Sequence, residues 1–114
     1  MSNVIELVQG LDSMLDHMRA DYAKRSNLGD DPNGTRARMS EEYSASLQYY
    51  MGKKYVKVTD GRSVKAFVVA CEDDKKFQYG DILKPAGWKT PARNFRRGNV
   101  LDRTFDRVRW TGAL

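Results

Sequence analysis

The spacing of apolar residues changes along this chain from a helical period to a period of two, and this change constrains the fold most strongly. Over residues 3–25, apolar side chains recur at alternating intervals of three and four, as on one face of a helix. From Lys53 onward, short runs alternate apolar and polar residues, which is typical of half-buried strands. The order predicts an α+β protein in which N-terminal helices precede a small antiparallel sheet.

The N-terminal segment, residues 1–25, is predicted to form one amphipathic helix. Its regularly spaced apolar stripe consists of Val4, Val8, Leu11, Leu15, Met18 and Tyr22. This spacing is typical of a coiled-coil seam, and equally of a helix that packs on its own domain. The stripe is therefore a candidate oligomerisation surface, for a homodimer or a partner protein, and the alternative is burial in the chain's own core.

The next segment, residues 26–38, is rich in turn-forming residues and predicts a flexible linker. A second domain is expected over residues 39–114. It begins with a short helix for which Ser40 is the predicted N-cap and which Gly52 ends. The predicted organisation is thus a helix, a linker, and a short helix followed by a β domain.

Five strands are predicted in this second domain, at residues 55–59, 63–71, 77–84, 98–102 and 105–111. Asp60-Gly61 is a strong hairpin signal between the first two of them. Five short strands joined by one long loop favour a five-stranded antiparallel SH3-like barrel. This expectation rests on analogy, and such a fold indicates no particular function.

The long loop, residues 84–99, interleaves basic and aromatic side chains. Pro91 and Gly98 suit the start and the end of a short helix within it. Arginine guanidinium groups pair with phosphate oxygens, and aromatic rings stack on bases. The candidate nucleic-acid or phosphate-binding residues of this loop and of the last strand are Trp88, Lys89, Arg93, Phe95, Arg96, Arg97, Arg107 and Arg109. The arginines are expected to face solvent; the alternative is that the two aromatic residues close the core and the arginines pair with acids.

Charge is distributed unevenly along the chain. Residues 1–31 contain six acidic and three basic residues, a net charge of −3. Since the whole chain has a net charge of +5, residues 32–114 carry a net charge of +8. A basic body favours a partner that bears phosphate or carboxylate groups, a nucleic acid, a nucleotide or an acidic protein. The alternative is that the charge serves solubility.

Residues with catalytic or metal-binding chemistry are sparse. His17 is the only histidine and is expected at an exposed helix position, and Cys71 is expected to be buried on a strand. Neither has the partners that a nucleophile or general base needs, so we expect no enzymatic activity, cofactor or metal. No apolar run approaches the ~20 residues of a membrane span, so no membrane partner is expected. A single cysteine indicates a reducing compartment.

The segments GKKYVKV, SVKAFVV and YGDILKPAGWKTPARNFRRGNVLD, continuing to VRWTG, resemble small proteins encoded by tailed bacteriophages. The resemblance covers roughly residues 50–112 and carries no known activity. It implies an accessory protein that acts in the cytoplasm of an infected bacterium. Binding of nucleic acid or a nucleotide is the leading functional hypothesis. Inhibition of a host defence or metabolic protein is the alternative, and a minor structural or assembly role is a third.

Overall fold

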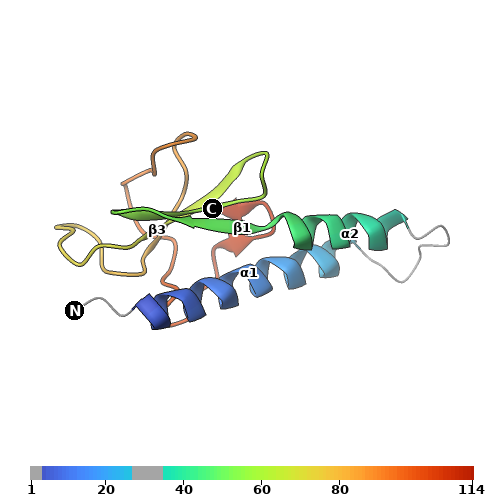
Figure 1. The fold of residues 1–114 in the computed structure, drawn as a ribbon, viewed down its shortest axis with the longest axis horizontal. Coiled ribbons are helices and arrows are strands. Elements are labelled where there is room, and N and C mark those ends of the chain that lie inside the picture. Colours follow the sequence, from blue (N-terminus) through green and yellow to red (C-terminus); the bar gives the residue numbers. More distant parts are fainter. Residues whose placement is uncertain (1–3, 27–34) are drawn as a thin grey trace.

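The computed structural model describes residues 4–26 and 35–114, which form two helices and six strands. The elements are α1 (Val4–Ser26), α2 (Thr35–Ser46), β1 (Gln48–Met51), β2 (Tyr55–Thr59), β3 (Val64–Val69), β4 (Ile82–Leu83), β5 (Val108–Arg109) and β6 (Gly112–Ala113). Helix α1 lies along one face of the sheet, and α2 continues the line of β1 (Figure 1). The predicted α+β class is confirmed.

The strands form an antiparallel sheet of order β1-β2-β3-β4 and a separate ribbon of β5 and β6. The predicted five-stranded SH3-like barrel is not confirmed, because these described strands do not close into one. The predicted fourth strand, residues 98–102, runs beside β4 through scattered bonds such as Ile82 N–H to Gly98 O at 2.9 Å. Gly80 and Gly98 both have positive φ, which interrupts a regular pleat at this place.

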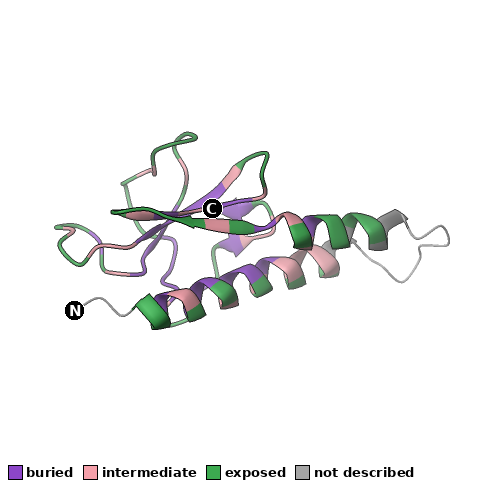
Figure 2. Ribbon diagram, in the orientation of Figure 1, coloured by how far each residue is buried: buried purple, intermediate pink, exposed green. Residues whose placement is uncertain are grey.

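The main core lies between α1 and the inner face of the sheet (Figure 2). Alternation along β2 directs Val56 and Val58 into this core and Lys57 to the opposite, outer face. A smaller apolar cluster on the outer face is built around Phe67 and Phe77. The sheet is therefore covered by α1 on one side and only partly by loops on the other.

The predicted oligomerisation stripe of α1 is used mainly within the chain. Leu11, Leu15 and Met18 are buried in the main core, and Tyr22 stacks on Tyr43 of α2 with ring centroids 4.5 Å apart. Val8 is half-buried, and only Val4, at the start of the stripe, is exposed. The structure thus gives the packing alternative for most of the stripe. Self-association through this helix stays a prediction, and it would have to use its exposed first turn.

The second helix differs from its predicted bounds at both ends. It begins at Thr35, so Ser40 is not its N-cap, and residues 35–38 of the predicted linker are helical. Residues 27–34 of that linker lie outside the described residues. The helix ends at Ser46 and not at Gly52, because residues 48–51 pair with β2 as strand β1. Pairing with a neighbouring strand outweighs the helical spacing of this segment, a tertiary effect that local pattern does not show.

Gly10 marks a close approach between α1 and the segment beside β4. A Cβ atom at Gly10 would lie 2.4 Å from the Val100 carbonyl oxygen. Alanine normally favours a helix over glycine by about 1 kcal/mol. We nevertheless expect Gly10→Ala to lower the free energy of unfolding by about 1–2 kcal/mol, because the overpacked contact has to shift. Urea unfolding measures this, with the exposed neighbour Gln9→Ala as control; a stabilised Gly10→Ala variant would contradict it.

Candidate nucleic-acid interface

Residues 84–92 form a hairpin-like loop that carries Trp88 and Lys89 near its tip. The Thr90 carbonyl oxygen accepts bonds from the N–H groups of residues 86 and 87, at 3.0 and 3.1 Å, and Ala92 N–H donates to Lys84 O at 2.7 Å. The short helix predicted from Pro91 does not form. The chain after Pro91 instead extends beside β4, where Arg97 N–H donates to Ile82 O at 2.7 Å.

The loop brings Trp88 over the outer face of the sheet. The Lys57 ammonium nitrogen lies 5.2 Å from the centroid of the Trp88 ring, a cation–π contact, and Trp88 keeps 53% of its surface exposed. Trp88 is therefore not a plug of the core. Tyr50, 55% exposed, is the register partner of Lys57 on edge strand β1, so both side chains belong to the same face.

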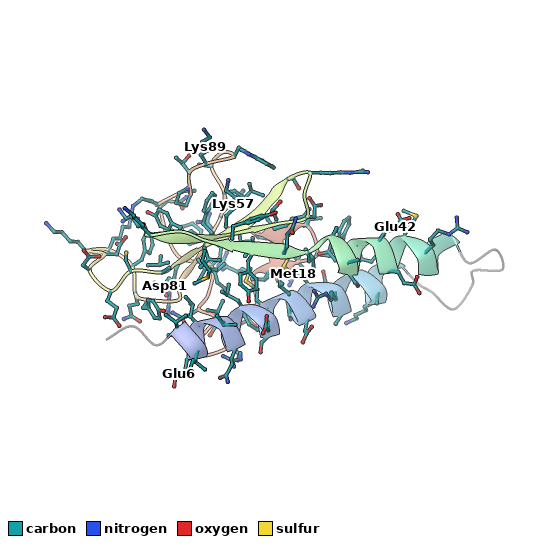
Figure 3. All side chains as sticks on the ribbon, viewed as in Figure 1. Glu6, Met18, Glu42, Lys57, Asp81 and Lys89 are labelled. Atoms are coloured by element: carbon teal, nitrogen blue, oxygen red, sulfur yellow. The ribbon has the colours of Figure 1, made fainter. Side chains whose placement is uncertain are left out.

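A shallow depression of about 280 Å³ continues this surface between the β2–β3 hairpin and the loop, with Arg62 and Trp88 in its lining. We call the exposed and half-buried residues of this region the outer-face patch: Tyr50, Lys57, Arg62, Trp88 and Lys89. Lys57 and Lys89 lie on one side of the sheet, and Glu6 of α1 lies on the other (Figure 3). The outer-face patch is thus basic and aromatic, whereas α1 carries four acidic and three basic residues.

Arg93, by contrast, is tied into the fold. Its two terminal nitrogens each lie 2.9 Å from an oxygen of Asp74, and it also donates to the Tyr55 hydroxyl. The Asp74 side chain is 1% exposed and accepts the N–H groups of Lys76 and Phe77 at 2.9 Å. The Arg93 guanidinium and these two N–H groups hold the pKa of Asp74 well below its ordinary value. Arg93 is thus a structural ion-pair partner.

Arg96 is half exposed and bonds a buried carboxylate. Its Nη1 lies 3.1 Å from Oδ1 of Asp81, whose side chain is 3% exposed. The same oxygen accepts a bond of 2.9 Å from the Asn99 amide, and Gln78 N–H donates to the other at 2.8 Å. The Arg96 side chain therefore keeps about half of its surface exposed, and its charge neutralises the buried Asp81 carboxylate.

Arg97 does not face solvent as expected. It is 5% exposed and lies against the Phe95 ring, with 3.9 Å between its guanidinium carbon and the ring centroid. Phe95 is 47% exposed, and Arg107 lies 5.6 Å from the centroid of the same ring. Arg109 is half-buried and donates to Asp106 O at 2.9 Å. The eight candidate residues are thus divided among separate sets of contacts.

Sequence reasoning missed three residues of the outer-face patch. Lys57 had a usable signal, because alternation in YVKVT places it opposite Val56 and Val58. Tyr50 had none, since its segment has helical spacing. The position of Arg62 beside Trp88 depends on how the β2–β3 hairpin and the long loop approach each other.

His17 and Cys71 are placed differently from their expected positions. His17 is half-buried, and its Nε2 lies 2.9 Å from the Val108 carbonyl oxygen, so it links α1 to β5. Cys71 follows β3 and is half-buried; burial, and then the nearby Asp73 carboxylate, raise the pKa of its thiol. Within residues 4–26 and 35–114 no group of three or more metal-ligating side chains comes together. No helix in these ranges has the length and apolarity to cross a membrane.

Comparison with known proteins gives one match. The model of a family of unknown function, DUF7717, matches residues 2–114. Neither the curated proteins nor the solved structures contain a match to this chain. The function therefore has to be argued from the surface described above.

Proposed function

The chain belongs to the DUF7717 family of unknown function, and we propose that it binds single-stranded nucleic acid, without enzymatic activity, through the outer-face patch. The observation that carries this proposal is the exposed Trp88 ring with the Lys57 ammonium beside it. Single strands bind where aromatic side chains stack on bases and cationic groups follow the phosphates. The patch supplies both on one face.

The geometry of the patch supports a single strand over a duplex. Tyr50 and Trp88 are exposed flat rings that each neighbour Lys57, one as its register partner on β1 and the other through the cation–π contact. Unpaired bases offer faces for such rings, whereas paired bases in a duplex are already stacked. Arg62 and Lys89, both exposed, add positive charge at the borders of the patch.

The distribution of charge supports the same binding mode. The patch carries three basic residues, Lys57, Arg62 and Lys89, whereas α1, on the opposite side of the sheet, carries four acidic and three basic residues. A polyanion is therefore attracted more strongly to the patch than to α1. The resemblance of residues 50–112 to tailed-phage proteins supports the cytoplasm of an infected bacterium as the setting.

The alternative is a protein–protein inhibitor that acts on a host defence or metabolic factor. The edge strand β1 favours it, because Tyr50 and Met51 are both about half exposed there. Sheet edges bind extended segments of other proteins. Salt separates the two functions: affinity for phosphate falls steeply as salt rises, and an apolar interface changes little.

Trp88→Ala is expected to weaken binding of a single-stranded oligonucleotide by about 1–3 kcal/mol, because one stacking ring is lost. Since Trp88 is half exposed, the thermal midpoint should change little. Lys57→Ala and Lys89→Ala should each reduce the slope of log affinity against log salt by about 0.7. Fluorescence anisotropy with a labelled oligonucleotide at several salt concentrations measures both effects.

The control is Lys24→Ala, which removes one exposed positive charge from α1. It should leave the affinity and its salt dependence close to those of the wild type. Absence of binding even at low salt would refute the proposal and favour the inhibitor. If Lys24→Ala and Lys57→Ala lost equal amounts of affinity for the oligonucleotide, net charge, and not the patch, would determine binding.

A further inference from the structure

Within the described part of the chain, the guanidinium of Arg97 is buried without a carboxylate partner. Its Nη1 donates to two uncharged oxygens, Oδ1 of Asn94 at 2.7 Å and the Phe95 carbonyl at 2.6 Å. Its Nε is buried and has no acceptor among the residues that the structure describes. Buried charges in proteins are normally paired, because removing a cation from water is costly. Arg97 is thus a buried cation whose hydrogen-bonding capacity is incompletely used.

Its neighbours add positive charge. The guanidinium carbons of Arg97 and Arg107 lie 3.9 and 5.6 Å from the centroid of the Phe95 ring, so two cations share one aromatic side chain. Burial, and then repulsion by Arg107, lower the pKa of Arg97. Contact with the ring offsets part of this cost, but a ring carries no net charge.

The other two arginines of the same segment show how this chain balances such groups. Arg93 has a carboxylate oxygen of Asp74 at 2.9 Å, and Arg96 has one of Asp81 at 3.1 Å. Both of those guanidinium groups are more exposed than Arg97. The least exposed of the three arginines is therefore the one for which residues 4–26 and 35–114 supply no anion.

We propose that Arg97 and Arg107, which both lie against Phe95, form a binding site for an oxyanion of the phosphate class. Two guanidinium groups offer planar, forked donors, and a tetrahedral phosphate accepts bonds from both at once. Arg107 and Phe95 are exposed side chains, so their rotation opens a path to Arg97. The site shares no residue with the outer-face patch and does not depend on the function proposed for it.

Inorganic phosphate is the first probe, with chloride at equal ionic strength as reference. Phosphate should raise the thermal midpoint of the wild type in a saturable manner, because a ligand that binds only the folded state stabilises it. Arg107→Gln should abolish this response. Without phosphate, Arg107→Gln should melt at or above the wild-type temperature, because repulsion on Arg97 is removed. Replacing a residue that only supports the fold would instead lower the thermal midpoint without phosphate.

Arg38→Gln is the matched control, since it removes one exposed arginine charge from α2 and belongs to neither proposed site. It should respond to phosphate as the wild type does. A nucleoside monophosphate is compared with inorganic phosphate by the concentration at which the rise in thermal midpoint saturates. A lower saturating concentration for the nucleotide, with no effect of the nucleoside alone, would identify a nucleotide as the source of the phosphate group. The proposal is overturned by a wild type that responds equally to chloride or acetate, or by an undiminished response in Arg107→Gln.

Discussion

The double substitution Leu11→Asp with Leu15→Asp is expected to unfold the protein. Both side chains are at most 4% exposed and pack between α1 and the sheet. Two carboxylates there would lose their hydration without gaining partners. The combined cost should exceed about 5 kcal/mol, which reaches the range of total stability for a small domain. Loss of the folded circular-dichroism signal and of a cooperative thermal transition measures it.

The control is Val4→Asp with Ile5→Asp, at positions 52% and 71% exposed on the same helix. This pair should keep the fold, with a change of about 1 kcal/mol or less. Light scattering of the same variants tests self-association through the exposed first turn of α1. If the Leu11 and Leu15 variant remained folded and only changed from dimer to monomer, the packing of α1 on the sheet would be wrong.

The helical and strand segments with the clearest periods could be predicted from the sequence. Helix α1 and strands β2 and β3 lie within a few residues of their predicted bounds. Each buries one face, and the spacing of its apolar residues in the sequence indicates that face. Strand β1 could not be found, since residues 48–51 are strand only through pairing with β2. The predicted fourth strand is irregular at Gly98, whose positive φ a pattern does not reveal.

The candidate site was predicted by residue type but not by arrangement. Trp88 and Lys89 are exposed in the loop where basic and aromatic residues alternate. The arginines that follow were expected to form one basic surface, and the structure gives Arg93 and Arg97 different surroundings. Three acids adjoin in the run from residue 72 to 74, and nothing local indicates that Asp74 alone is the partner of Arg93. Such pairing is decided by contacts between distant segments.

The ion pair of Arg93 and Asp74 should make a pH-dependent contribution to stability. We expect Arg93→Ala to lower the free energy of unfolding at pH 7 by about 2–3 kcal/mol, because a buried carboxylate loses its counterion. This is less than for a fully buried pair, since the Arg93 side chain is 37% exposed. Urea unfolding at pH 7 measures the loss. The free energy of unfolding of Arg93→Lys should lie between those of the wild type and Arg93→Ala, because lysine keeps the charge but not the paired bonds.

The sign of the pH dependence follows from the lowered pKa of Asp74. A carboxyl group whose pKa is lower in the folded than in the unfolded state stabilises the fold above its unfolded pKa, and this contribution is lost as pH falls through the folded value. The difference between wild type and Arg93→Ala should therefore be full at pH 6–7. It should shrink at acid pH, as Asp74 takes up its proton first in the folded variant, which lacks the guanidinium, and only at lower pH in the folded wild type. Arg62→Ala, at an exposed position, should stay within about 0.5 kcal/mol of the wild type throughout. If Arg93→Ala were as stable as the wild type at pH 7, Arg93 would be free of a structural role and available for phosphate after all.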